Sequence, residues 1–121
     1  MRLGLVIILL AACGNGGGNA SRDALIAAWK TGGLAPSAFT AVKDSPVGND
    51  CQAGTVNNVD VMVCSYPTPD AAKAAQDLGL KWVGDTTGIA TPKGSLLIVA
   101  ADRKKADTKG TTINQLVKLA P

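Results

Sequence analysis

The stretch CQAGTVNNVDVMVC, residues 51–64, predicts a β-hairpin closed by a disulfide. Symmetrical folding places Asn57 and Asn58 at the two turn positions of a type I′ turn, which needs positive φ at both, and asparagine tolerates that conformation. Cys51 then lies opposite Cys64 in a non-hydrogen-bonded pair, whose Cα atoms are about 4.5 Å apart and within disulfide range. We therefore predict a Cys51–Cys64 bridge, which contributes about 3 kcal/mol by closing a loop of this size.

The same hairpin sorts its side chains onto two faces, because successive residues of a strand point to opposite sides. Four valines are expected on one face, and the two cysteines on the other: Val56, Val59, Val61 and Val63 against Cys51, Ala53, Met62 and Cys64. The alternatives to a structural bridge are two free buried thiols or a redox-active pair. A redox pair is more often spaced as C-x-x-C, which this sequence lacks here.

Outside the hairpin, the N-terminus has the organisation of a secretory signal: Arg2, then an apolar run over residues 3–12, then Cys13. Ten apolar residues are about half of the roughly 20 that span a bilayer as a helix. The segment Leu10-Ala11-Ala12-Cys13 resembles the bacterial lipobox, which a signal peptidase cuts before the cysteine. The alternative is a buried N-terminal strand or helix that contains a chance cysteine.

The lipobox resemblance implies that Cys13 carries a diacylglycerol and a further acyl chain such as palmitate. Two or more acyl chains anchor a protein stably. The expected organisation is a signal peptide over residues 1–12, a lipidated Cys13 and flexible tether over 13–20, and one domain over 21–121. In enteric lipoproteins an Asp directly after the cysteine keeps the protein in the inner membrane. This chain has Gly14 there, so the resemblance implies an outer-membrane destination. The seven residues 14–20 reach at most about 25 Å, so the domain is expected close to the lipid surface.

Composition excludes several classes of function. The chain has 121 residues, 12 Lys and Arg, 9 acidic residues and no His, and every acidic residue is Asp. Its net charge of +3 implies no nucleic-acid partner, because such domains are usually far more basic. Without His, a Ser-His-Asp triad and imidazole zinc sites are excluded. We expect no enzyme activity, no catalytic residue, no metal and no cofactor.

The remaining pattern predicts an α+β domain. Ser21 fits as the N-cap of a helix over 22–31, whose apolar face carries Leu25, Ala28 and Trp29, and residues 39–43 form a strand candidate. Thr68 fits as the N-cap of a second helix that ends at Gly79, with an apolar face of Ala71, Ala74, Ala75 and Leu78.

Trp82-Val83 is expected in a short strand, and the apolar run 95–101 in a central strand. Residues 112–115, TINQ, match a capping box that opens a last helix with an apolar stripe of Ile113, Leu116, Val117 and Ala120. The predicted order is α-β-β-β-α-β-β-α. It gives a small single domain with an antiparallel or mixed sheet of four or five strands and about three helices.

The one charge cluster is Arg103, Lys104 and Lys105, with Lys109 nearby. These four residues, called the basic cluster below, are the candidates for contact with an anionic surface, where each basic residue contributes about 1 kcal/mol. A solvated loop is the alternative, because Asp102 and Asp107 flank the cluster. Trp29, Trp82 and Tyr66 are weaker candidates for ligand contact, and core packing against the sheet is the favoured explanation of the tryptophans.

These observations predict a lipid-anchored protein of the bacterial envelope. It is expected to act as a non-catalytic binding or interaction module, with the membrane and an unidentified envelope protein or polymer as partners. A second interpretation is peptidoglycan binding, because the strand-helix-strand order and the Pro69-Asp70-Ala71-Ala72 helix start are loosely similar to SPOR domains. A third is an Asp-dependent hydrolase, because Asp85-Thr86-Thr87-Gly88 resembles the loop of aspartic proteases with one residue inserted.

Overall fold

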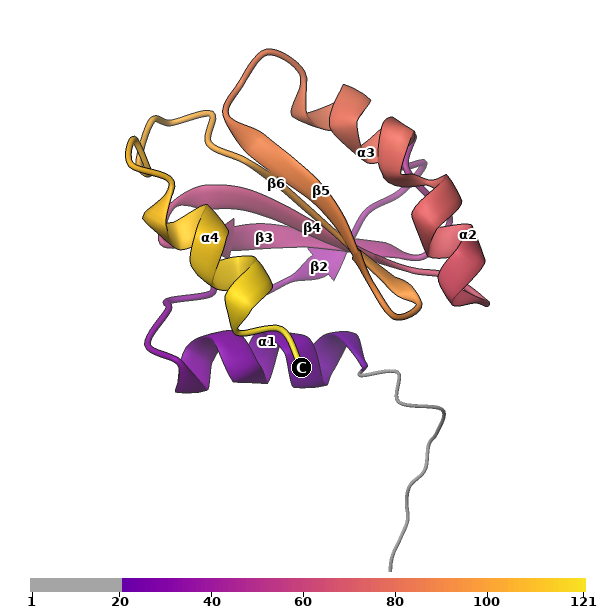
Figure 1. The fold of residues 1–121 in the computed structure, drawn as a ribbon, viewed down its shortest axis with the longest axis horizontal. Coiled ribbons are helices and arrows are strands. Elements are labelled where there is room, and N and C mark those ends of the chain that lie inside the picture. Colours follow the sequence, from indigo (N-terminus) through magenta and orange to yellow (C-terminus); the bar gives the residue numbers. More distant parts are fainter. Residues whose placement is uncertain (1–20) are drawn as a thin grey trace, which may run out of the picture.

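The computed structural model describes residues 21–121 of the chain. The expectations for the signal peptide, the lipidated Cys13 and the tether fall on residues 1–20 and lie outside the described part. Within that part the fold is α+β, and the element order follows the prediction (Figure 1). The elements are α1 (Arg22–Thr31), β2 (Thr40–Ala41), β3 (Cys51–Val56), β4 (Val59–Ser65), α2 (Pro69–Ala74), α3 (Gln76–Val83), β5 (Gly88–Lys93), β6 (Leu96–Ala101) and α4 (Thr111–Lys118).

The five strands form one antiparallel sheet in the order β2-β3-β4-β6-β5. Its centre is the predicted hairpin: Cys51 pairs with Cys64 and Val56 with Val59. Asn57 and Asn58 occupy the turn with φ of 50° and 69°. The hairpin is confirmed in register and in turn conformation.

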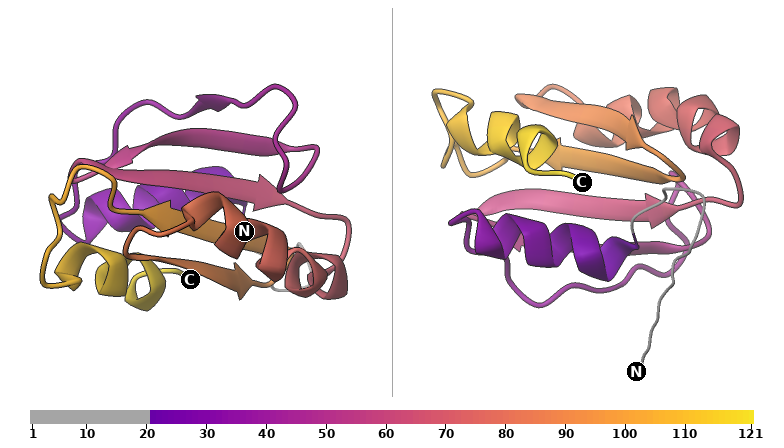
Figure 2. Two further views of the ribbon diagram at one scale, coloured as in Figure 1. Left: turned by 90° about the horizontal axis from the view of Figure 1, so that it is seen from above. Right: turned by 60° about the horizontal axis from the view of Figure 1, so that its bottom comes forward.

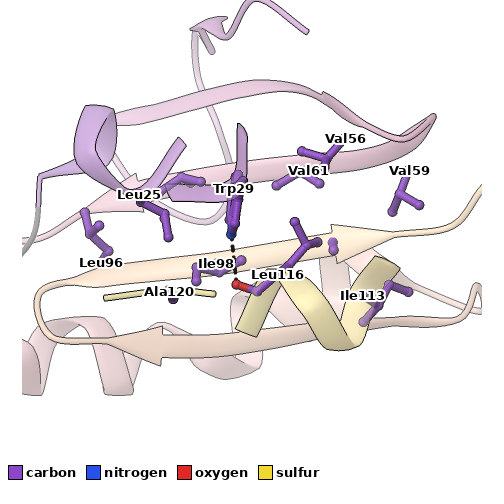
Figure 3. Close-up of a cluster of buried hydrophobic side chains, with 12 residues drawn as sticks. Leu25, Trp29, Val56, Val59, Val61, Leu96, Ile98, Ile113, Leu116 and Ala120 are labelled. Atoms are coloured by element: carbon purple, nitrogen blue, oxygen red, sulfur yellow. Dashed lines mark hydrogen bonds between the residues drawn. The ribbon is translucent and has the colours of Figure 1, made fainter. Parts of the chain in front are cut away.

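Helices cover both faces of this sheet, giving three layers (Figure 2). One core cluster joins the four hairpin valines and β6 to α1 and α4, through Leu25, Trp29, Ile113 and Leu116 among others (Figure 3). The other joins Cys51, Met62 and Cys64 to α2, α3 and the loop carrying Val47. The predicted division of the hairpin into a valine face and a cysteine face is therefore confirmed. All six residues of β6 are buried, as expected for a central strand covered on both sides.

Two helix starts are capped as predicted. Ser21 Oγ accepts a hydrogen bond from Ala24 N at 3.1 Å, and Thr68 Oγ1 accepts one from Ala71 N at 3.1 Å. Each cap satisfies one of the first backbone N–H groups of its helix, which have no partner within the helix.

The second helical segment differs from the prediction. It breaks at Ala75 into α2 and α3, passes through Gly79 and ends at Val83, so Trp82 and Val83 are helical and do not form a strand. The fourth predicted strand is found instead at β5. The buried face carries Ala72, Ala75, Gly79 and Val83, whereas Leu78 is exposed.

Gly79 has a packing role that explains why the helix continues through it. A Cβ built on Gly79 would lie 2.9 Å from Ala90 Cβ and 3.2 Å from Val99 Cγ2. The missing side chain lets α3 lie directly on β5 and β6, and this close contact offsets the low helix propensity of glycine.

Both edges of the sheet offer few free backbone groups. The β2 edge is only two residues long. At the β5 edge, Pro92 has no N–H, and Gln76 Nε2 donates a hydrogen bond to the carbonyl of Ala90 at 2.7 Å. Short strands, prolines and occupied carbonyls are among the ways in which proteins protect exposed edges.

Candidate functional site

The basic cluster lies on the 102–110 loop, which connects β6 to α4. The Arg103 guanidinium lies over the Trp82 ring, 4.2 Å from its centroid, and Arg103 Nη2 donates a hydrogen bond to the Trp82 carbonyl at 2.6 Å. Trp82 is half-buried and packs at the edge of the core, as expected for a packing role, and its ring also contacts Arg103.

Asp60 partly neutralises the basic cluster. Its carboxylate lies 3.7 Å from Arg103 Nη1 and 3.8 Å from Lys104 Nζ. Lys105 and Lys109 are exposed and form no ion pair within residues 21–121. The sequence therefore placed four cations together, but the structure leaves only two of them free of an acidic partner in the described part.

Two buried aspartates give the 102–110 loop its shape. Asp102 accepts hydrogen bonds from the N–H groups of Ala106 and Asp107 at 2.8 and 2.9 Å. Asp107 accepts from Thr112 N and Ile113 N, both at 2.9 Å, and so satisfies two N–H groups at the start of α4.

The predicted capping box at residues 112–115 is therefore wrong, because the capping carboxylate comes from five residues upstream of Thr112. The Asp-dependent hydrolase gains no support from this pair, since both carboxylates already accept backbone hydrogen bonds.

A small hollow of about 330 Å³ lies between this loop and the turn before β5. It is lined by Asp85, Thr86, Thr87, Asp102, Arg103, Lys105 and Thr108. Lys105 adopts φ of 56°, a left-handed conformation that is uncommon for a residue other than glycine. The DTTG segment is thus a turn at the rim of this hollow, next to basic side chains.

Arg103 is expected to act mainly in folding. Arg103→Ala removes the stacking on Trp82 and the hydrogen bond to its carbonyl, and we expect it to lower the free energy of unfolding by about 1 kcal/mol. Lys105→Ala is the matched control and should change stability by less than about 0.5 kcal/mol. Urea denaturation of both variants measures the difference, and equal effects would contradict the structural role of Arg103.

A second polar site, which the sequence did not predict, lies at the opposite end of the sheet. Two neighbouring hollows of about 500 and 480 Å³ share Ser65, Tyr66 and Pro67. We call them together the Tyr66 cleft. The first is also lined by Ser21, Arg22, Asp23, Gln52, Ser95 and Leu96, and the second by Gly48, Asn49 and Asp50. The volumes are in the range of small-molecule sites.

The register places the two sites at opposite ends. Asp60 pairs with Ala101 beside the 102–110 loop, whereas Ser65 pairs with Leu96 beside the Tyr66 cleft. The start of α1 lies at the cleft end, where Arg22 Nη1 donates to the carbonyls of Asp50 and Val63 at 3.0 and 3.2 Å. Strand β6 separates the ends by about 17 Å at the rise of an antiparallel strand.

Tyr66 is held firmly within the cleft. Its hydroxyl donates a hydrogen bond to the Val47 carbonyl at 2.8 Å, and Gly48 packs so close to the ring that a Cβ there would lie 2.9 Å from the hydroxyl oxygen. Burial raises the pKa of Tyr66, so the hydroxyl stays protonated and keeps donating. Tyr66, a weak candidate from the sequence, is therefore held in a fixed position directly after β4.

Among the buried side-chain polar atoms of residues 21–121, that of Ser95 alone has no hydrogen-bond partner. The residue is 8% exposed, and its Oγ is a buried polar atom without a hydrogen-bond partner. Ser95→Ala removes an unsatisfied buried hydroxyl, and we expect it to raise the free energy of unfolding by about 1 kcal/mol. Guanidinium denaturation tests this, with the half-buried Ser65→Ala as control. A loss of stability in Ser95→Ala would mean that the hydroxyl has a partner.

The two hairpin cysteines form the predicted disulfide, and both are buried at 2% and 0% exposure. Their Cα atoms are 4.0 Å apart. Within residues 21–121, no three His, Cys, Asp or Glu side chains come together as ligands for a metal ion. No helix in this same part is long and apolar enough to cross a membrane.

Comparison with known proteins adds no relative. No protein-family model matches the chain, and no curated protein or solved structure matches it either. The function is therefore argued from the residues and their geometry.

Proposed function

We propose that this chain is an exported lipoprotein of the bacterial cell envelope, anchored through Cys13, which serves as a non-catalytic binding module. The buried Cys51–Cys64 disulfide carries the proposal. Disulfides persist in oxidising compartments outside the cytoplasm, and a signal peptide with a lipobox-like Cys13 provides the route there.

A non-catalytic role is supported by how the polar groups of the domain are used. Asp102 and Asp107 accept backbone hydrogen bonds, and Asp60 pairs with two basic residues. The chain has no His that could act as a general base. These side chains stabilise loops, whereas the Tyr66 cleft is left open for a ligand.

Intact-mass analysis of the chain purified from its host membranes tests the anchor. The expected mass corresponds to residues 13–121 with a diacylglycerol and a further acyl chain, and it should fall after alkaline removal of ester-linked chains. The matched control is Cys13→Ser, which should stay unprocessed and unacylated. A native chain that still begins at Met1 without acyl groups would overturn the proposal.

The anchor also sets a geometric condition for the basic cluster. A tether of seven residues reaches about 25 Å at most, and the cluster lies about 17 Å farther along the sheet than Ser21. Because this reach exceeds the 17 Å separation, the tether is long enough for the basic cluster to contact the anchoring membrane.

We propose that Lys105 and Lys109 make this contact with anionic headgroups. Replacing both by alanine should weaken co-sedimentation of residues 13–121 carrying Cys13→Ser, which lack both the signal segment and the lipid, with phosphatidylglycerol vesicles by about tenfold or more at low salt. The double variant Lys30→Ala, Lys118→Ala removes the same charge elsewhere and should have a smaller effect. Equal effects of the two double variants would mean that the basic cluster is only a solvated loop.

Peptidoglycan binding through a SPOR-like sheet stays a separate prediction. Pelleting of the chain with purified peptidoglycan at low salt tests it directly, and absence from the pellet would remove it.

A further inference from the structure

Unused hydrogen-bonding groups gather in the Tyr66 cleft. Gln52, Ser65 and Ser95 all line its first hollow, and none of their side chains makes a hydrogen bond within residues 21–121. Buried polar side chains normally find a partner, and Ser95 Oγ is a buried atom without one. Gln52 and Ser65 are half-buried and add two free polar side chains at the same hollow, which indicates a place where a polar ligand supplies partners.

The framework around these groups is already fixed. Tyr66 N donates to the Ser95 carbonyl at 2.9 Å, and Ser65 N donates to the Asp50 carbonyl at 2.8 Å. The Tyr66 hydroxyl is bound to the Val47 carbonyl. Because the backbone is occupied by these bonds, a ligand would be recognised by side-chain hydroxyl and amide groups on a largely preformed surface.

The charges of the cleft disfavour an anionic ligand. Arg22, the only cation among the lining residues, binds Asp50 Oδ1 at 3.0 Å and two backbone carbonyls. The remaining charged group is Asp23, which forms no ion pair in the described part. A phosphate or carboxylate would meet a neutralised guanidinium and a free carboxylate.

The second hollow shares Ser65, Tyr66 and Pro67 with the first and is also lined by Gly48, Asn49 and Asp50. The Tyr66 ring packs against the core cluster of the cysteine face, whereas Gln52 and Ser65 lie on the valine face, so ligand recognition rests on the first hollow. A ligand that bonds its free hydroxyl and amide groups needs several hydroxyl groups and no negative charge. We infer that the Tyr66 cleft binds a neutral saccharide, with Gln52 and Ser65 bonding its hydroxyl groups.

A peptide is the less suitable occupant. Extended peptides bind mainly by adding a strand to a free sheet edge. The Tyr66 cleft lies at strand ends, its Ser65 and Tyr66 N–H groups are already bonded, and Pro67 has none. Few backbone N–H groups are therefore free here to bond the main chain of a peptide.

Amide chemical-shift titration of the mature chain, residues 13–121 with Cys13→Ser, tests the inference, with tri-N-acetylchitotriose and maltotriose as probes. At least one of them should cause saturable shifts around Gln52, Ser65 and Ser95, and the stronger probe identifies the sugar class. Gln52→Ala should weaken the dissociation constant about fivefold or more, as expected for one lost hydrogen bond. Lys104→Ala, at the opposite end of the sheet, is the matched control and should bind normally.

Several results would overturn it: no saturable shifts with either saccharide, shifts with inorganic phosphate or a capped neutral tripeptide instead, or unchanged affinity in both Gln52→Ala and Ser65→Ala. Spectral dispersion of each variant shows whether it is folded. This inference deepens the proposed binding role but does not depend on the anchor. Failure of the lipoprotein proposal appears in the mass of the native chain, whereas failure of the cleft appears only in the titration.

Discussion

Replacing both Cys51 and Cys64 by alanine is expected to lower the free energy of unfolding by about 3 kcal/mol. The bridge closes a loop of 14 residues in the unfolded chain, and most of its contribution comes from restricting that state. For a domain of this size the change corresponds to a fall in Tm of about 15 °C. Typical domains are stable by only about 5–15 kcal/mol, so this is a large share of the total.

Thermal unfolding with and without a reductant measures this effect. The wild-type protein should lose stability when it is reduced, and the double alanine variant should be insensitive to the same treatment. The comparison separates the bridge from the loss of two sulfur atoms that pack in the core with Val47 and Met62. If the reduced wild type unfolds at its original Tm, the bridge makes no contribution to stability.

Trp29→Ala should cost about 4 kcal/mol, the largest effect of any single substitution that we predict. Trp29 is fully buried between α1 and the sheet, so its removal leaves a large cavity. Its Nε1 also donates a hydrogen bond to the Leu116 carbonyl at 2.9 Å (Figure 3). That carbonyl lies in the last turn of α4, where carbonyls lack partners within the helix.

Trp29→Phe separates the two contributions. Phenylalanine keeps most of the ring volume but loses the hydrogen bond to α4, so we expect a cost of about 1–2 kcal/mol. Trp82→Phe is the control, because Trp82 is only half-buried and its indole N–H makes no hydrogen bond in the described part. Guanidinium denaturation gives all three values. A Trp29→Ala effect no larger than that of Trp82→Phe would contradict the central position of Trp29 in this core.

The hairpin could be predicted in full because its signals are local and agree with one another. The Asn57-Asn58 turn, the cysteine spacing and the alternating valines all require the same register. The caps at Ser21 and Thr68 were likewise predictable, since a cap depends on residues only three apart.

The errors arise where distant contacts override local preference. Gly79 was taken as a helix end, but its contact with Ala90 and Val99 depends on the sheet, which local pattern does not specify. The β5 sequence GIATPK is a weak strand signal because it contains glycine and proline. The Asp107 cap was missed because a better-known pattern, TINQ, begins at Thr112 within the first turn of α4, whereas the capping carboxylate lies five residues upstream of it.

The basic cluster and the Tyr66 cleft also differ in how local they are in the sequence, and this decided which of them could be predicted. The basic cluster is contiguous in sequence, so it was found, although its pairing with Asp60 needed the sheet register. The cleft draws its residues from α1, β3, the end of β4 and the β5–β6 turn. No stretch of sequence contains enough of it to be noticed, and only Tyr66 gave a signal of its own.

The protected sheet edges affect how neighbouring copies of the protein interact when they are crowded together. Molecules confined to a plane collide far more often than molecules in free solution, and exposed strand edges are where identical chains begin to template one another. One edge of the sheet is a strand of only two residues, and the other carries Pro92 and an occupied Ala90 carbonyl. Both edges therefore offer a neighbouring chain few free backbone groups for strand pairing. Crowding of copies should therefore lead to little edge-to-edge strand pairing between them.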